Sequence, residues 1–276
     1  MSGGLQGARR SAAVPAVALA VLLGLCVAAP SAKAAQPELV AAGSLLLPGL
    51  GQAVNGDYAA GAAQLGLALV FSHQLTVLSR RDDYLDAEAR IDARERLIRV
   101  NRTTYAAELY ATALTDLGLY SAFGAYRDAR AADEARVYST PAPTESAQEL
   151  ALAPFRWRHL SRPTFFVPLA ALALAALAPR SAEAYAYAPD ESITRDELAT
   201  GIFVQHEMVA IGEEAFFRGV LNNSLSHALG ETWGLAASSL VFGLSHDGLG
   251  NQATPAGATL FGLYAGYLHQ RNDYEL

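Results

Sequence analysis

The chain has 276 residues, of which 52% are hydrophobic and 17% are charged, and its formal net charge is −7. The apolar residues form long blocks, which is typical of a multi-span membrane protein rather than of a soluble domain. The negative charge and the lack of a basic, aromatic-laced groove argue against nucleic acid as a partner. The sequence therefore predicts an all-α, multi-span transmembrane helical bundle in contact with membrane lipid.

Residues 1–34 are predicted to be a signal peptide. Arg9 and Arg10 precede the apolar run AVPAVALAVLLGLCVAA at 13–29, and SAKAAQ then offers a small-residue cleavage site. The alternative is an uncleaved first anchor helix. Cys26 is the one cysteine and lies inside the apolar run, so the cleaved chain would form neither a disulfide nor a thiolate metal site.

The next segment, residues 35–126, is predicted to be an N-terminal helical membrane module. Two apolar arms, at about 39–53 and 58–78, flank a turn rich in Pro, Gly and Asn. The first arm is short for a membrane span, whereas the second is long enough. The stretch LPGLGQAVNGDYAAG resembles the opening of a small bacterial membrane module of unknown function, in which a PGLGQ turn joins two apolar helices.

Two further segments complete the N-terminal half. Residues 80–102 carry many acidic and basic side chains three or four positions apart, which predicts a solvated connecting helix. The apolar and aromatic run 103–125 is another candidate span. The polar segment 127–155, with STPAPTES near its centre, is predicted to be a linker between two domains.

The second domain is predicted to cover residues 156–276. It begins with a basic collar and an apolar helix at about 164–178, and the positive-inside rule places the collar on the cytoplasmic side. A loop over 184–198 follows, with Asp190 or Ser192 as the helix cap. The sequence shows no alternating strand pattern and no internal repeat. The remaining helices are expected at about 198–228, 232–245 and 254–270.

The chemistry is expected in GEEAFFRGVL, at 212–221, where three ionisable groups interrupt an apolar helix. Glu214 and Arg218 are four residues apart, so a helix places them side by side as an ion pair. Glu213 is turned by about 100° and has no partner on its own helix. A charge at the centre of a bilayer costs about 2.5–3.5 kcal/mol on insertion scales, so Glu213 needs another partner.

The next apolar helix ends in VFGLSHD, which contains Phe242 and His246 four residues apart. The turn LGETW should fold the two helices into an antiparallel hairpin. Glu213 lies about as far before this turn as His246 lies after it, so the two side chains are expected to meet. A carboxylate facing an imidazole in a dry site can activate a water or hold a metal.

These motifs resemble the CPBP family of intramembrane proteases, which includes the type II CAAX prenyl proteases and the bacteriocin-processing or immunity (Abi) proteins. EEAFFR matches the EExxxR motif, and FGLSH matches the FxxxH motif of that family. Gly262 and Gly266 match the GxxxG face of its next helix. The resemblance covers about 160–276, and nothing upstream of it matches.

The resemblance implies an α-helical membrane core with the active site in a cavity. Glu213 would activate water, and His246 would assist it or bind a metal. Glu214 and Arg218 would fix the helix geometry, and Phe242 would line the site. Both metal-dependent and metal-free mechanisms are argued for the family. Glu213 and His246 are therefore candidate ligands for a divalent metal such as zinc, although a catalytic zinc site has three protein ligands.

The sequence departs from the family at its C-terminus. The family has a third motif, HxxxN or HxxxD, on a further helix, whereas this sequence ends at Leu276 where that helix should begin. HQRND at 269–273 has the HxxxD spacing, but its place at a helix end indicates a chance match. The protease domain is therefore expected to be incomplete, with catalysis in doubt.

The sequence thus predicts an integral protein of a bacterial inner (plasma) membrane that hydrolyses a peptide bond in a peptide or protein substrate. Glu213 would take the proton from water, and His246 would orient that water or stabilise the oxyanion. The alternative is a non-catalytic membrane interaction or immunity protein built on the same bundle. A transporter could also bury an Arg–Glu pair, but it would need more spans and an inverted repeat.

Overall fold

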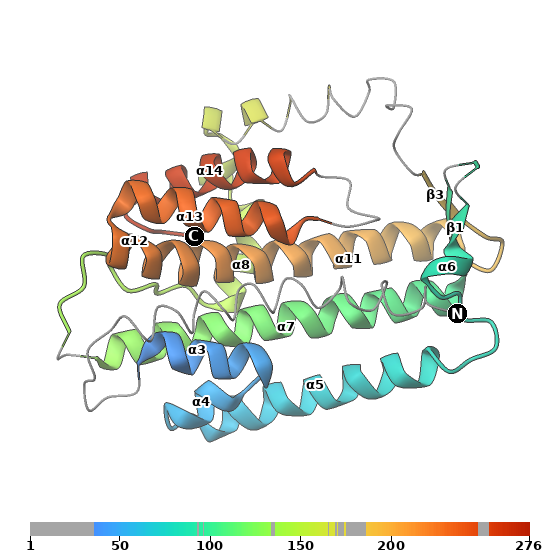
Figure 1. Ribbon diagram of the computed structural model, residues 1–276, viewed down its shortest axis with the longest axis horizontal. Coiled ribbons are helices and arrows are strands. Elements are labelled where there is room, and N and C mark those ends of the chain that lie inside the picture. The colour runs from blue at the N-terminus through green and yellow to red at the C-terminus, as the bar shows by residue number, and fades with distance from the viewer. Residues whose placement is uncertain are drawn as a thin grey trace.

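The fold is mostly helical, with one small sheet, in a computed structural model of the chain (Figure 1). The predicted signal peptide at 1–34 and most of the predicted helix at 164–178 lie outside the residues that the structure describes. Those residues are 36–92, 94–95, 97–133, 136–164, 166–168, 170, 174, 186–247 and 254–276.

The two predicted apolar arms form three helices. The first arm is α3 (Pro37–Leu46) followed by α4 (Leu50–Val54), and the second is α5 (Tyr58–Leu78). Gly49 joins α3 to α4 with φ of 95°, and a Cβ there would collide with the backbone of Gly61. Only glycine fits this combination of positive φ and close approach, which explains the Pro-Gly step of the turn.

Among the described residues, one helix, α5, is long and apolar enough to cross a membrane. Only 11% of its apolar 18-residue stretch is buried within the protein. The predicted multi-span bundle is therefore not confirmed. The predicted span 103–125 is instead part of α7 (Arg102–Ala132), a helix of 31 residues. Its polar side chains, including Glu108 and Asp116, lower its hydropathy.

The mixed-charge segment at 80–102 is not the single helix that the sequence predicted. It contains a four-residue helix, α6 (Ala87–Arg90), and the antiparallel strands β1 (Ile91–Asp92) and β2 (Leu97–Val100). β2 also pairs in parallel with β3 (Ala186–Pro189), so the mostly helical fold includes a small sheet that no alternating pattern in the sequence indicated. The apolar residues explain the difference, because β2 buries Ile98 and Val100 against Tyr105.

α7 is the central helix of the fold. It runs beside a continuous helical rod made of α11 (Arg195–Glu213), the π-helical segment η2 (Glu214–Asn222) and α12 (Asn223–Leu229) (Figure 1). Three side chains of α7 pack against glycines of the rod. The two residues of each pair are equally far apart in the sequence, so the two helices run parallel in a constant register. The pairs are Tyr105 with Gly201, Asp116 with Gly212, and Phe123 with Gly219.

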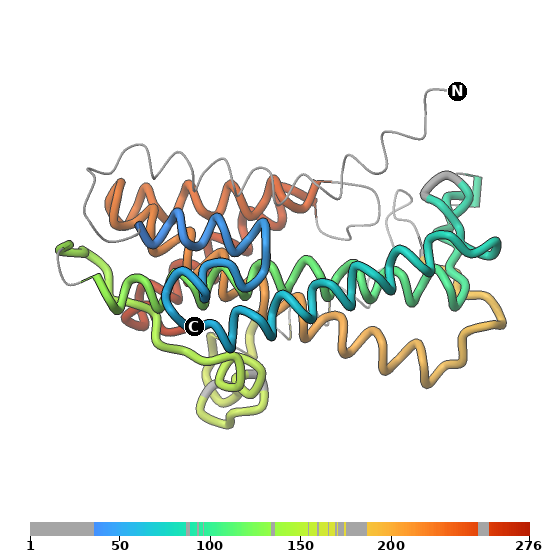
Figure 2. The backbone as a smooth tube through the Cα atoms, turned by 90° about the horizontal axis from the view of Figure 1, so that it is seen from below, coloured from blue at the N-terminus to red at the C-terminus, as the bar shows by residue number. Residues whose placement is uncertain are grey.

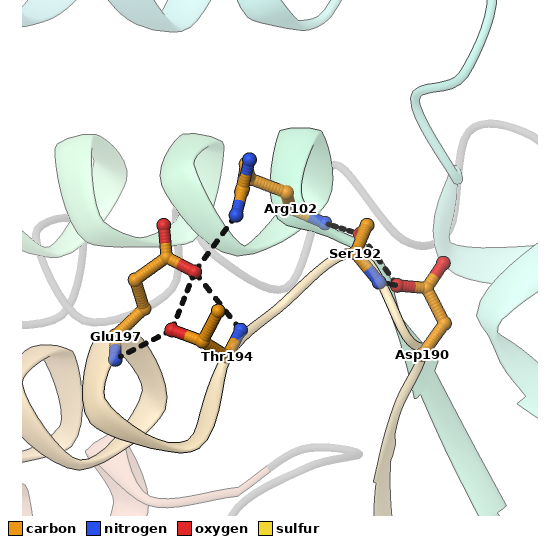
Figure 3. Close-up of polar contacts among 5 residues, drawn as sticks. All are labelled: Arg102, Asp190, Ser192, Thr194 and Glu197. Carbon is orange, nitrogen blue, oxygen red and sulfur yellow. Dashed lines mark hydrogen bonds and ion pairs between the residues drawn. The ribbon is translucent and has the colours of Figure 1, made fainter.

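The start of α11 is fixed by a capping box and not by the predicted caps Asp190 or Ser192. The Thr194 hydroxyl accepts from the Glu197 backbone N–H at 3.2 Å, and the Glu197 carboxylate accepts from the Thr194 backbone N–H at 2.9 Å (Figure 3). These backbone and side-chain hydrogen bonds from Thr194, together with one from Arg102, lower the pKa of Glu197 to about 2. Ser192 instead accepts from the backbone N–H of Arg102 at 2.9 Å, which ties this loop to α7.

Replacing Thr194 with alanine should destabilise the protein by about 1 kcal/mol, because the cap of α11 loses its acceptor. Thermal unfolding in detergent measures the effect. Thr115→Ala is the control, because the Thr115 hydroxyl donates only to the Ala111 carbonyl of its own helix. Equal melting temperatures for the two variants would contradict a stabilising role for the cap.

The predicted linker is partly structured. It contains α8 (Ala147–Leu152) and the 3₁₀ turn η1 (Ala153–Phe155), and α9 (Trp157–Leu160) follows. Figure 2 shows this stretch, in yellow-green, standing out from the layer of long helices. Thr140 of this segment is buried against α7. The domain boundaries themselves remain predictions.

The last two helices agree with the sequence pattern. α13 (Glu231–Ser245) and α14 (Pro255–Arg271) pack against each other and against η2 (Figure 1). Gly230, with φ of 84°, makes the sharp turn between α12 and α13. The main core lies where α7, η2 and α13 meet, and its largest fully buried side chains include Phe123, Tyr126, Phe216, Phe217 and Leu221.

Candidate active site

Glu213 and His246 meet at one end of the hairpin, as the sequence predicted. Glu213 is the last residue of α11, and His246 follows the last residue of α13. The Glu213 Oε2 and His246 Nε2 atoms are 4.0 Å apart. Their side chains are 27% and 19% exposed, respectively, so both are shielded but accessible to a small molecule.

The ring of His246 is held by its own helix. Its Nδ1 lies 2.8 Å from the carbonyl oxygen of Phe242, and a carbonyl only accepts, so Nδ1 carries a hydrogen. This bond turns Nε2 toward Glu213. The gap of 4.0 Å is too long for a direct hydrogen bond, but a water molecule can bridge such a separation.

Glu214 and Arg218 form the ion pair that their spacing predicts, with 3.3 Å between Arg218 Nε and Glu214 Oε2. The Arg218 side chain is 3% exposed and its guanidinium lies 4.4 Å from the centre of the Phe242 ring. A cation over an aromatic face is attracted by the ring quadrupole. Phe242 also contacts His246, with 4.5 Å between the centres of the two rings. Phe242 therefore lies between the ion pair and His246.

The helix carrying this motif changes its pitch immediately after Glu213. Glu214–Asn222 is π-helical, whereas the sequence pattern predicted an ordinary α-helix. π-Helical turns are rare and occur frequently at functional sites. The change places Glu213 at the junction between two helix types. The wider turn holds Phe216 and Phe217 in the core, where the Phe217 ring meets Phe242 edge-on at 5.0 Å.

A comparison with protein-family models matches residues 196–274 to the family described as type II CAAX prenyl endopeptidase Rce1-like. Both motifs lie inside the matched segment, as does the whole Glu213–His246 site. The matched segment, 79 of the 276 residues, is similar to that family. No curated protein and no solved structure matches the chain. The family is described as an endopeptidase family, and endopeptidases act on peptides or proteins.

The candidate metal ligands Glu213 and His246 are not joined by a third donor among the residues that the structure describes. Among them, no group of three or more His, Cys, Asp or Glu side chains could hold a metal ion. Glu213 and His246 supply two donors, whereas a catalytic zinc site uses three protein ligands and an open position. Within the described part of the chain, the donor set is therefore one protein ligand short of a catalytic zinc site.

The HxxxD-like sequence at 269–273 does not join the site. His269 is buried on α14, and its Nδ1 lies 3.0 Å from the carbonyl oxygen of Glu275. It lines a pocket of about 410 Å³ together with Glu214 and Arg218, and neither Glu213 nor His246 lines that pocket. Asp273 is exposed in a left-handed turn with φ of 54°.

One acidic residue near Glu213 was missed by the sequence analysis. Asp116 of α7 packs against Gly212, the residue before Glu213, and is 7% exposed. The available signal was its isolation, because Asp116 is the one charged residue in LYATALTDLGLYSAFGAY at 109–126. A lone carboxylate in an apolar helix is a functional hypothesis by default.

Proposed function

We propose that this chain is an intramembrane endopeptidase in which Glu213 activates the water that attacks a peptide bond. The observation that carries the proposal is the separation of 4.0 Å between Glu213 Oε2 and His246 Nε2, inside the segment that matches the endopeptidase family. Two polar groups at this spacing can hold one water molecule between them. A carboxylate within hydrogen-bond reach of the water whose proton it takes meets the geometric requirement for a general base.

The proposed reaction needs only the groups of this pair. Glu213 takes a proton from water while the water oxygen bonds to the carbonyl carbon of the substrate. His246 orients the water, because Nε2 carries no hydrogen and accepts a hydrogen bond from the second hydrogen of the water. Glu213 then returns the proton to the leaving nitrogen as the C–N bond breaks, which regenerates the carboxylate.

We place the protein in a membrane, and specifically in a bacterial inner membrane. α5 supplies one candidate span. Large apolar side chains are also exposed on the catalytic half, among them Phe203, Trp233, Leu240, Leu244 and Leu260. Such side chains in contact with lipid would leave the Glu213–His246 pair in a site with restricted water, where electrostatic interactions are stronger.

A non-catalytic membrane interaction or immunity protein is the second candidate. One observation favours it: among the described residues His246 is the histidine that faces Glu213, whereas His269 lines a separate pocket. A site with fewer polar groups stabilises a transition state less well. In that case the same bundle would bind a partner without turnover.

A cleavage assay separates the two candidates. The full chain is placed in liposomes with either a farnesylated peptide ending in a CAAX sequence or a library of unprenylated peptides, and products are identified by mass spectrometry. Cleavage of either substrate by the wild-type chain, with no cleavage in empty liposomes, is the expected result. No cleavage of either substrate by a correctly folded chain would overturn the endopeptidase assignment and favour the non-catalytic candidate.

A further inference from the structure

Residues 155–164, the basic segment, carry positive charge that the proposed reaction does not use. The sequence between Glu149 and Glu183 contains four arginines and no acidic residue, although the whole chain has a net charge of −7. Three of these arginines fall within the basic segment, namely Arg156, Arg158 and Arg162. Such a local concentration of one sign of charge attracts a partner of the opposite sign, so the basic segment is suited to an anionic partner.

Large aromatic side chains stand among these arginines and are exposed. Trp157 is 77% exposed and Phe155 is 61% exposed. Figure 2 shows the yellow-green stretch that contains them standing out from the layer of long helices. Neither ring is therefore part of the core of the described chain. Exposed apolar side chains that are rimmed by charged ones mark a surface that contacts a partner or a membrane.

This combination of residues favours a lipid surface as the partner. Tryptophan and phenylalanine are typical of segments that lie in the interface of a membrane, and arginines beside them attract anionic headgroups. In the sequence, the apolar run at about 164–178 follows the basic segment directly, and it is predicted to enter the membrane there. A nucleic acid would be repelled by the acidic remainder of the chain.

The basic segment is also tied to the catalytic half. The Tyr264 hydroxyl of α14 donates to the Thr164 carbonyl oxygen at 2.6 Å. Arg162 and Arg218 line the same pocket of about 410 Å³, but two glutamates line it too and balance their charge. We therefore place the anionic ligand on the outer face of the basic segment, where Arg162 is exposed, and not inside the pocket.

We propose that the basic segment is a membrane-surface element that binds the headgroups of anionic phospholipids. The three arginines attract the phosphate groups, while Trp157 and Phe155 insert beside the upper parts of the acyl chains. Because Thr164 is hydrogen-bonded to α14, this binding also sets the depth of the catalytic helices relative to the membrane surface. The inference does not depend on the cleavage reaction, but it rests on the proposed placement of the protein in a membrane.

The test uses the fluorescence of Trp157. The chain contains two tryptophans, so Trp233→Phe leaves Trp157 as the one that remains. This full-length variant is placed in phosphatidylcholine liposomes that contain increasing fractions of brominated phosphatidylglycerol or brominated phosphatidylcholine, because bromine quenches tryptophan on contact. The two quenching curves give the relative affinity for the two lipids. We expect a preference for phosphatidylglycerol of at least about fivefold, the factor that one arginine contributes near an anionic surface.

The matched control is Trp157→Phe, which leaves Trp233 as the fluorescent residue. Trp233 is 71% exposed on α13, and the sequence contains no arginine or lysine between Arg218 and Arg271. The two lipids should therefore quench Trp233 equally.

Two charge variants, made in the Trp233→Phe chain, test the arginines themselves. Replacing all three arginines with glutamine should lower the lipid preference at Trp157 to about one, whereas replacing them with lysine should keep most of it, because lysine retains the charge. Both variants should melt within a few degrees of the parent chain, because they change a surface segment. The substitutions in the two variants are Arg156→Gln, Arg158→Gln and Arg162→Gln, or Arg156→Lys, Arg158→Lys and Arg162→Lys.

The outcomes separate this proposal from the others. Equal quenching of Trp157 by the two lipids would overturn it, as would a preference that survives in the glutamine variant or is lost in the lysine variant. Quenching of Trp233 without quenching of Trp157 would also overturn it, favour a soluble acidic protein as the partner of this surface, and leave the membrane placement intact. No quenching of either tryptophan would overturn the membrane placement as well. None of these results depends on whether the chain cleaves a peptide.

Discussion

Replacing Glu213 with glutamine is expected to reduce peptide cleavage by about a thousandfold, the range lost when a general base is removed. Glutamine has the size of glutamate and can still accept a hydrogen bond from water, but it cannot take the proton. The substrate contacts are unchanged, so the loss should appear in kcat while KM stays within about twofold. Steady-state cleavage in liposomes measures both constants.

The control for this prediction is Glu207→Gln on the same helix. Glu207 lies in α11 two turns before Glu213 and is partly exposed, and no ion pair is found for it within the described part of the chain. Cleavage by this variant should stay within about twofold of wild type. A Glu213→Gln protein that folds normally and cleaves at more than a tenth of the wild-type rate would rule out Glu213 as the base.

His246→Gln should be less severe than the change at Glu213, because His246 orients the water but does not accept the proton in the proposed reaction. The expected loss is about a hundredfold in kcat, because a reacting group displaced by about 1 Å can cost that much. The same assay reports it. If His246→Gln cost more than Glu213→Gln, the two roles would have to be exchanged.

The long helices could be predicted from sequence because their signals are local. Gly230 and Pro255 interrupt apolar runs of the sequence. In the structure α12 ends just before Gly230, and α14 begins at Pro255. The sheet could not be predicted in this way. β2 pairs in parallel with β3, which lies far along the sequence, and no local pattern records such a partner.

The candidate site likewise contains one contact that the sequence predicted and one that it did not. Glu213 and His246 were expected together because they are nearly equidistant from one turn of a hairpin, and the structure brings them to 4.0 Å. Asp116 was not expected, because its place depends on the register between α7 and α11. The sequence indicates that register only through small residues such as Gly212, and their role becomes clear only when the side chain that packs on them is known.

Asn223, at the start of α12, makes several hydrogen bonds to the N-terminal half of the chain. Its Oδ1 atom accepts hydrogen bonds from the Thr140 hydroxyl at 2.7 Å, from the Tyr126 hydroxyl at 3.3 Å and from the buried guanidinium of Arg130. Its Nδ2 atom donates to the Pro141 carbonyl at 3.0 Å. One side chain therefore joins the start of α12 to α7 and to the predicted linker.

Asn223→Ala should destabilise the protein by about 3 kcal/mol, since it leaves the buried charge of Arg130 without one of its acceptors as well as removing the other bonds. Thermal unfolding in detergent measures this loss. The control is Asn55→Ala, because Asn55 is exposed and makes a single bond, to the Ala125 carbonyl at 2.9 Å, and its loss should cost less than about 1 kcal/mol. Similar melting temperatures for both variants would mean that α7 and the catalytic helices are held together by apolar packing alone. A large difference would show that the catalytic hairpin needs the N-terminal half to be stable, although that half lies outside the family match.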